Sequence, residues 1–235
     1  MESIGLMFKT FWSPGESTAA ISKKPRILVP LILISLLSTS IGIVAIAKID
    51  FGALAIQQME RSGRIQNLNE QQREQTLQFS RRILPVTFIV SGIVGPTLLL
   101  TIVTAIYFGI FTLIGREANF KTFFSLTLFA YVPLILRNVV SVVQLFAIPQ
   151  EQINIQELGS LGLQLLLDPT TSSKVAYALA GAVDIFSIWI MILLCIAYKN
   201  GVRKSVGKGL VAVGVVVPYL CFALIGAGLR MLQAG

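Results

Sequence analysis

The sequence predicts an all-α fold, a polytopic bundle of five transmembrane helices preceded by an amphipathic N-terminal interfacial helix. Three observations predict it: long apolar stretches, a very hydrophobic composition, and basic residues gathered in alternate connections. A helix rises about 1.5 Å per residue, so about 20 apolar residues cross ~30 Å of hydrocarbon with every backbone amide bonded internally. Five stretches are long enough for this: residues 27–47, 83–115, 122–147, 175–198 and 209–229.

The composition excludes an ordinary soluble domain. Hydrophobic residues make up 54% of the chain and charged residues 13%, too few polar groups to cover a water-exposed surface. The net charge of +8 is divided among the connections, which indicates contact with anionic lipid headgroups and argues against nucleic-acid binding. Cys195 and Cys221 fall inside predicted spans, where cysteine behaves as a small apolar residue, so neither a disulfide nor a metal site is indicated.

The distribution of lysine and arginine predicts the orientation. The leader of residues 1–26 and the connections 116–121 and 199–208 are basic, and all three lie on one side of a five-span protein. The polar connection 48–82 is also basic, but it is long and carries acidic residues as well, and long segments translocate with little regard for charge. We therefore expect a multi-pass membrane protein with a cytoplasmic amino terminus and a carboxyl terminus outside.

A cleaved signal peptide is the alternative for the first stretch. Ala45, Ile46 and Ala47 resemble a small-residue cleavage site behind an apolar segment. The apolar core of a signal is usually about 7 to 15 residues long, and this stretch is longer. We expect the segment to be retained; cleavage would leave four spans.

The leader has the spacing of an amphipathic helix. Ile4, Phe8 and Phe11 share one helical face, and Ser13 to Glu16 has the pattern of a helix start. Such a helix either lies on the cytoplasmic headgroups or packs against the bundle, and the residues do not decide between the two. The expected interfacial anchors are Trp12, Lys23, Lys24 and Arg26.

Two connections outside the membrane have contrasting patterns. The glutamine-rich connection 48–82 contains Asn69 with Gln72 three residues on, a helix-capping pattern. It is either a helix that projects toward a partner or a solvated linker. The segment 149–174 is apolar but too short to cross the membrane, so we expect an interfacial or re-entrant helix over the outer mouth of the bundle.

Small residues and prolines inside the spans predict helix packing and bending. Ser38 with Gly42, and Ser91 with Gly95, are small pairs at four-residue spacing that let neighbouring helices approach. Proline removes a backbone donor and bends a helix. The predicted kinks are at Pro96, Pro133 and Pro218.

Two charges interrupt the apolar stretches at matching depth. Arg137 lies 16 residues beyond Lys121, and Asp184 lies 15 residues before Lys199. At about 1.5 Å per residue these depths are about 24 and about 23 Å from the inner surface. Because an isolated charge in hydrocarbon is costly, we expect Arg137 and Asp184 to form an intramembrane ion pair. That pair either fixes helix register or binds a proton, an ion or a polar ligand; separate snorkelling toward the outer interface is the third alternative.

The sequence does not indicate an enzyme, a metal site or a cofactor. It has no histidine, the commonest general base and metal ligand, and no serine-elbow, zinc-protease or phosphate-loop motif. The segment from Gly181 to Asp184 faintly resembles an intramembrane aspartyl protease. That chemistry needs two carboxylates, and no second acid lies within a span. We therefore expect no catalytic residue.

Three segments resemble the Yip family, the Ypt/Rab-GTPase-interacting proteins, in particular its bacterial members. They are FWSPGESTAAISKKPRILVPLIL (residues 11–33), FKTFFSLTLFAYVPLIL (120–136) and DIFSIWIMILLCIAYKNGVRKS (184–205). The resemblance implies a non-enzymatic, five-span protein of a bacterial inner membrane with a cytoplasmic amino terminus. Eukaryotic members are associated with small prenylated GTPases and with vesicle traffic, so a small GTPase is a partner implied by the resemblance alone.

Two functions follow as hypotheses. The first is a membrane scaffold or adaptor that binds the lipid bilayer, other membrane proteins or a second copy of itself, with a role in membrane organisation or trafficking. The second is a small transporter or channel subunit that uses the Arg137 and Asp184 pair. A water-filled cavity reaching both charges favours transport, and a dry, satisfied bridge favours the scaffold.

Overall fold

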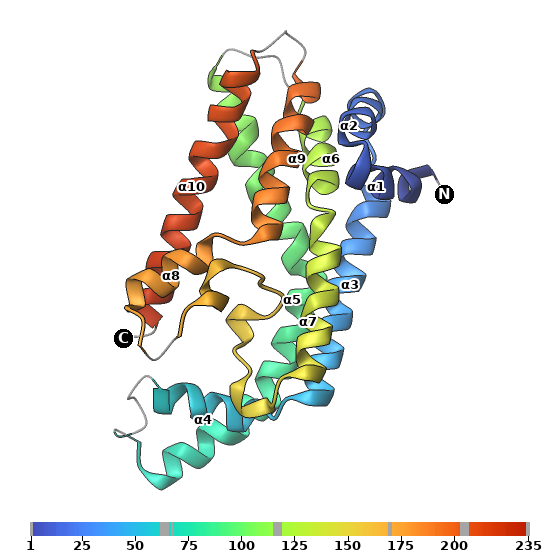
Figure 1. Cartoon of the computed structure of the whole chain (residues 1–235). Helices are drawn as coiled ribbons and strands as arrows, with labels where there is room; N and C mark the ends of the chain where they lie inside the picture. The colour runs from blue at the N-terminus through green and yellow to red at the C-terminus, as the bar shows by residue number, and fades with distance from the viewer. Residues whose placement is uncertain are drawn as a thin grey trace.

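The computed structural model describes residues 2–61, 66, 68–114, 119–168, 171–202 and 207–233, and these residues form an all-α polytopic bundle with no strand (Figure 1). The elements in chain order are α1 (Glu2–Trp12), α2 (Pro14–Lys23), α3 (Leu28–Lys48), α4 (Phe51–Arg61), α5 (Glu70–Leu113), α6 (Phe120–Ala130), α7 (Pro133–Ala147), three 3-10 turns η2 (Gln150–Gln152), η3 (Ile155–Glu157) and η4 (Leu163–Leu166), then α8 (Lys174–Ala182), α9 (Ile185–Gly201) and α10 (Lys208–Gln233).

Four of the five predicted stretches are helices long and apolar enough to cross a membrane. They are Leu28–Lys48, Glu70–Leu113, Phe120–Ala147 and Gly209–Gly228. Figure 1 shows α3, α5, α6 with α7, and α10 running along the long axis of the molecule. The leader helices α1 and α2 lie beside the start of α3, whereas α10 finishes near the opposite end of the bundle. The last residue of the predicted second span, Gly115, is outside the described residues.

The fourth predicted span is not one helix. Residues 175–198 divide between α8 and α9, which are separated by Val183 and Asp184. Asp184 is extended, with φ −122° and ψ 143°, and its side chain caps α9. Only α9 runs along the bundle; α8 lies across it and packs against α10 (Figure 1). The prediction of a continuous span was wrong because a capping aspartate ends the helical conformation on its amino-terminal side.

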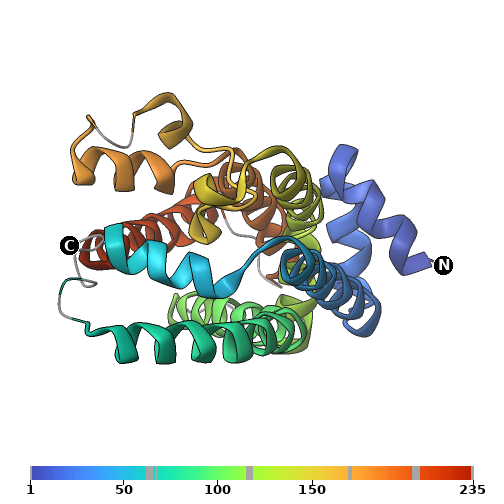
Figure 2. The same ribbon diagram turned by 90° about the horizontal axis from the view of Figure 1, so that it is seen from below.

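The predicted cap at Asn69 is present. The backbone N–H of Gln72 donates to Asn69 Oδ1 at 2.8 Å, and the N–H of Asn69 donates to Gln72 Oε1 at 2.9 Å. Helix α5 then continues for 44 residues, so the polar connection and the second span share one helix. α4 packs against the polar start of α5, and Figure 2 shows the two side by side across the end of the bundle.

An ion pair closes this hairpin at its base. The Asp50 carboxylate accepts from Arg81 Nε at 3.1 Å and from Arg81 Nη2 at 2.6 Å. The Arg81 guanidinium lowers the pKa of Asp50 to about 2. The connection is therefore held against the bundle. It is neither the projecting helix nor the solvated linker that the sequence had suggested.

The three predicted kink prolines have different settings. Pro133 starts α7 after a turn at Tyr131 and Val132, so the third stretch is interrupted there. Pro96 and Pro218 stand inside continuous helices, α5 and α10, and a bend at either one stays a prediction. Pro85, which the sequence reasoning missed, also lies inside α5, between its polar start and its apolar remainder.

Small residues bring α3 and α5 together. A Cβ on Gly92 would lie 2.7 Å from Thr39 Cα, and one on Gly42 would lie 3.3 Å from the backbone oxygen of Phe88. Gly42 was expected at such a contact, but Gly95 has no atom near its Cβ position. The close contact with α3 is therefore made by Gly92 and not by Gly95. The face of α5 that contacts α3 does not include the predicted residue Gly95.

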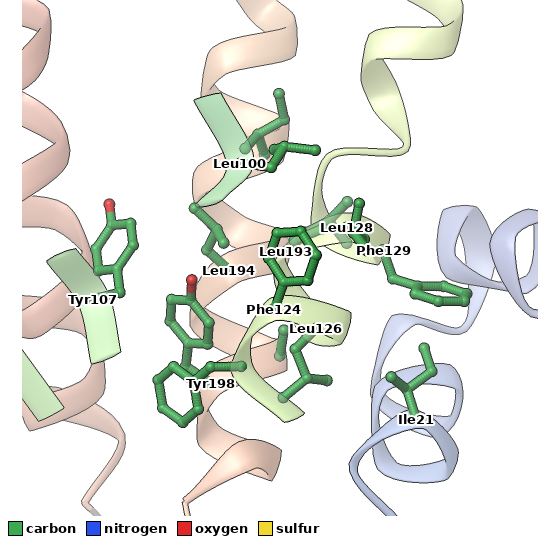
Figure 3. Close-up of a cluster of buried hydrophobic side chains, with 14 of the residues drawn as sticks. Ile21, Leu100, Tyr107, Phe124, Leu126, Leu128, Phe129, Leu193, Leu194 and Tyr198 are labelled. Atoms are coloured by element: carbon green, nitrogen blue, oxygen red, sulfur yellow. The ribbon is translucent and has the colours of Figure 1, made fainter. Parts of the chain in front are cut away.

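A dry aromatic core joins α5, α6, α9 and the leader. Phe123 and Tyr198 are stacked with ring centroids 4.7 Å apart, and Tyr107 lies 5.2 Å from Tyr198. Figure 3 shows this cluster with Ile21 of α2 at its edge, so the leader contributes to the core. The Tyr198 hydroxyl shares a hydrogen bond of 2.8 Å with the Thr127 hydroxyl, which satisfies both groups inside the apolar interior.

Candidate functional site: a cavity at Arg137 and Asp184

Arg137 on α7 and Asp184 at the start of α9 line one cavity of about 490 Å³. The structure therefore brings the two predicted site residues to the same place. The ion pairs among the described residues do not include one between Arg137 and Asp184. The expected salt bridge is absent here because other groups already satisfy the Asp184 carboxylate.

Four hydrogen bonds surround the Asp184 carboxylate, whose residue is only 4% exposed. Oδ1 accepts from the backbone N–H groups of Phe186 at 2.8 Å and Ser187 at 3.2 Å. Oδ2 accepts from the N–H of Leu161 at 2.7 Å and from the hydroxyl of Ser160 at 3.0 Å. The first pair caps α9, whose positive dipole end also favours a carboxylate. The second pair ties the connection between α7 and α8 to that same helix start.

This connection folds back toward the bundle interior instead of forming the expected helix over its mouth. It consists of the short turns η2, η3 and η4, and its middle reaches the level of the α9 start (Figure 1). The N–H of Leu163 donates to the Val183 carbonyl at 3.1 Å, and Gly162 bridges to Asp184. Irregular backbone at such a depth is tolerated where other protein groups form hydrogen bonds with its N–H and C=O groups.

Gly159 fastens the same connection to α7. Its φ of +75° is in the left-handed region, and a Cβ there would lie 2.8 Å from the Arg137 backbone oxygen and 2.9 Å from Arg137 Cγ. Its N–H donates to Gln144 Oε1 at 2.6 Å. Only glycine combines a favourable positive φ with the absence of a Cβ that would collide with Arg137. The backbone of this connection thus packs against the stem of Arg137.

A buried glutamine extends the polar network. Gln164 is 1% exposed, and its Nε2 donates to Ser160 Oγ at 2.7 Å, which in turn donates to Asp184. Gln164 Oε1 is buried and has no hydrogen-bond partner in the described part of the chain. Ser160 and Gln164 were not predicted as site residues. Their only sequence signal is that both are polar within an apolar connection.

The cavity has a polar part and an apolar wall. Helices α5 and α10 supply most of the apolar wall, and Leu99 and Ile102 at its edge are 51% and 57% exposed. The Tyr107 hydroxyl donates to the Val215 carbonyl at 3.2 Å and links these two helices. Tyr219 lies within electrostatic range of both charges. The other polar residues of the lining are Tyr131, Ser160 and Ser187.

The Asp184 carboxylate is arranged as a hydrogen-bond acceptor for backbone and hydroxyl groups. Within the described ranges, no group of three or more cysteine, aspartate or glutamate side chains could hold a metal ion. The Asp184 carboxylate is occupied by four donors. Its oxygens are engaged in positioning the backbone, whereas a general base needs a lone pair directed at a substrate proton.

The leader combines a packed helix with an exposed one. The Asn200 amide of α9 donates to Thr18 Oγ1 of α2 at 2.8 Å, and the Phe11 ring meets Trp189 edge-on at 5.4 Å. Trp12, by contrast, is 70% exposed. Helix α2 therefore packs on the bundle, while part of α1 faces outward.

The expected basic anchors also differ in their contacts. Lys23 and Lys24 are exposed. Arg26 pairs with Glu2, and its N–H donates to Ser125 Oγ at 2.7 Å. Arg26 lowers the pKa of the Glu2 carboxyl through a side-chain hydrogen bond and its charge. Arg26 therefore holds the leader to α6, and the two lysines remain available to the surroundings.

The comparison with known families agrees with this architecture. A family model for the Yip1 domain matches residues 8–228, nearly the whole chain. Comparison with curated proteins and with solved structures finds no significant match. The matched range includes the leader from Phe8 onward, the long apolar helices up to residue 228 and the cavity residues. The chain therefore belongs to the Yip1 domain family and is an integral, multi-pass membrane protein of that family.

Proposed function

We propose that the protein is a non-enzymatic membrane scaffold or adaptor that binds lipids or other membrane proteins through its leader, with its amino terminus in the cytoplasm and its carboxyl terminus outside. The observation that carries this proposal is an outward apolar face on α1. Ile4, Phe8 and Trp12 are spaced by four residues, which places them on one face of the helix, and they are 40%, 58% and 70% exposed.

The rest of the leader supports this role because it fixes α1 in place. Met7 on the opposite side of α1 and Ile21 of α2 are buried in the core. Lys23 and Lys24 follow at the end of α2, exposed and positively charged. An apolar face beside lysines is the arrangement that binds anionic membrane surfaces. The family resemblance adds a small GTPase as a hypothesis for the partner.

A photo-crosslinker at position 8 tests the proposal in the full-length protein in native membranes. We expect crosslinks to lipid or to a defined membrane protein, and fewer crosslinks from the same position when Trp12 is replaced by serine. The matched control places the crosslinker at Ala20, which is exposed on α2 away from the apolar face. Equal crosslinking from both positions would show that the α1 face has no special role.

The orientation requires a separate experiment. Reporter domains fused to each end should show a cytoplasmic amino terminus and an external carboxyl terminus, because the leader and the connections 116–121 and 199–208 carry the short basic segments. Detection of both ends on one side of the membrane would contradict the five-crossing arrangement.

The cavity favours a second candidate, a small transporter or channel subunit. It reaches both Arg137 and Asp184, and α8 with α9 forms a broken helix of the kind that transporters place at substrate sites. Ion or solute flux into proteoliposomes that contain the full chain tests this candidate. Flux that is lost in an Asp184→Asn variant would support transport; equal leakage from protein-free liposomes would leave the scaffold.

A further inference from the structure

The positive charge of Arg137 is not neutralised by the described part of the chain. Its guanidinium forms no ion pair or hydrogen bond with a described residue, and the nearby Asp184 carboxylate is occupied by Ser160 and three backbone donors. A charge among apolar helices needs a counter-charge. The Asp184 carboxylate caps the amino-terminal end of α9, so that helix end adds no positive potential to the cavity. An anion from outside the chain would give the Arg137 guanidinium the direct partner that it lacks among the described residues.

The lining of the cavity matches an amphiphile better than a small inorganic anion. Tyr131, Ser187 and Tyr219 surround the polar part with hydroxyl groups. The apolar wall follows two helices over several turns. Its side chains are Leu99, Ile102, Val103, Ile106 and Phe222. A molecule with an anionic head and a hydrocarbon chain would satisfy both parts at once.

The cavity is also accessible from the side where lipid lies. Leu99, Ile102 and Phe222 are 51%, 57% and 44% exposed, and they belong to the spanning helices α5 and α10. An acyl chain can thus pass from the bilayer along this wall without crossing a polar barrier. Arg137 is about 24 Å from the inner surface of a ~30 Å hydrocarbon core, which is close to the outer headgroups.

We propose that this cavity is a binding site for one anionic phospholipid of the outer leaflet, with its phosphate on Arg137 and an acyl chain between α5 and α10. Arginine forms paired hydrogen bonds with phosphate oxygens, and the surrounding hydroxyl groups can donate to the remaining ones. This site lies away from the leader, so it does not depend on the scaffold function; only its assignment to the outer leaflet rests on the orientation proposed above.

Native mass spectrometry of the full chain in neutral detergent tests the site by titration with phosphatidylglycerol and, in parallel, phosphatidylcholine. We expect one tightly bound phosphatidylglycerol per chain and weaker binding of phosphatidylcholine. Arg137→Gln should weaken phosphatidylglycerol binding at least about tenfold, because a hydrogen-bonded charge pair is lost. Arg137→Lys should lose less, because the charge remains. Arg82→Gln is the matched control, since Arg82 is exposed on the polar side of α5.

A cavity-filling variant separates lipid binding from folding. A Cβ at Gly226, which lines the cavity, meets no atom within 4 Å, so Gly226→Leu should fold normally and weaken phosphatidylglycerol binding. Equal affinity for the two lipids, an Arg137→Gln variant that binds like wild type, or an effect of Arg82→Gln as large as that of Arg137→Gln would each overturn the proposal. Displacement of the lipid by inorganic phosphate alone would also overturn it, because a free anion would then be the ligand.

Discussion

The aromatic core and the Asp184 region hold the bundle together by different means. In the core, Phe123 and Tyr198 are fully buried and stack directly, and short-range hydrogen bonds such as that between the Tyr198 and Thr127 hydroxyl groups satisfy the polar atoms. Around Asp184, irregular backbone is held by hydrogen bonds to one carboxylate, and a cavity of about 490 Å³ remains beside it. The comparison teaches that close packing leaves no room for a ligand, whereas a hydrogen-bonded frame can enclose a space.

The largest expected effect is that of Asp184→Ala. The substitution removes the acceptor of four donors in a poorly solvated place, and each unsatisfied donor costs about 1–3 kcal/mol. We expect a severe loss of folded protein, measured as the monodisperse fraction in fluorescence-detected size-exclusion chromatography.

Asp184→Asn is the matched control, because its one remaining carbonyl oxygen can still cap α9, and it should lose less. A charge swap of Arg137 with Asp184 should not restore folding, since the donors are mostly backbone N–H groups. Recovery in the swap would show instead that the two charges interact directly and that the hydrogen-bonded frame is secondary.

A smaller effect is expected for Gly92→Ala, which tests close packing. The new Cβ would lie 2.7 Å from Thr39 Cα, and backbone atoms cannot yield without moving a helix. Overpacking of this kind costs about 1–3 kcal/mol, so the midpoint of thermal unfolding in detergent should fall.

Gly95→Ala makes the same chemical change one turn away, where no atom lies near the Cβ position. It should be neutral or slightly stabilising, because alanine is the better helix former. Equal destabilisation by both variants would mean that helix flexibility, and not the contact with α3, decides the outcome.

Tyr198→Phe should have a smaller effect still. It keeps the stacked ring and removes one hydroxyl from a buried hydrogen bond with Thr127. The expected cost is about 1 kcal/mol in the free energy of unfolding, the usual size for one buried hydrogen bond. Denaturant titration of the purified protein provides the measurement. A loss as large as that of Gly92→Ala would mean that hydrogen bonding matters in the core as it does around Asp184.

The smallest effect belongs to the ion pair of Asp50 with Arg81 at the base of the hairpin that α4 and the start of α5 form. The pKa of Asp50 is lowered from 3.8 to about 2 in the folded protein, so the pair stabilises the hairpin above pH ~4 and is lost as the pH falls through ~2. Both side chains are substantially exposed, and solvent screening keeps the gain in stability small.

Asp50→Asn should therefore increase proteolysis of the α4 hairpin slightly at pH 7. Hydrogen exchange of the same segment should show the difference between wild type and variant shrinking as the pH approaches 2. A difference that persists unchanged at low pH would assign the effect to the caps that Asp50 provides for Gly52 and Ala53.

The sequence predicts regular helices much better than it predicts the site. Stretch length located four spanning helices, and the cap at Asn69 followed from local spacing. The sequence placed Arg137 and Asp184 at a common depth, and the structure places both in the lining of one cavity. The hydrogen bonds of the Asp184 carboxylate were not predicted: two come from N–H groups at the start of α9, and two come from Ser160 and Leu161 in the connection between α7 and α8. Contacts of this kind depend on tertiary structure, and local periodicity does not contain them.

The connection between α7 and α8 could not be predicted for a similar reason. Gly159 needs a positive φ and a close approach to Arg137, but glycine alone carries no sign of either. The contact at Gly92 was missed because the predicted pair of small residues, Ser91 and Gly95, was equally plausible, and Gly95 lies one turn away from Gly92. The partner helix decides which face of a helix makes a contact. The partner of α5 here is α3, and the sequence of α5 alone does not show this.

The placement of α8 has a consequence for the outline of the molecule in the bilayer. Figure 1 shows the leader beside one flank near one end of the bundle and α8 beside the other flank nearer the opposite end. Each adds width at a single level, since neither runs the full length of the bundle. The protein is consequently not cylindrical: the leader widens one flank near one end, α8 widens the other flank nearer the opposite end, and the cross-section therefore changes along the bundle.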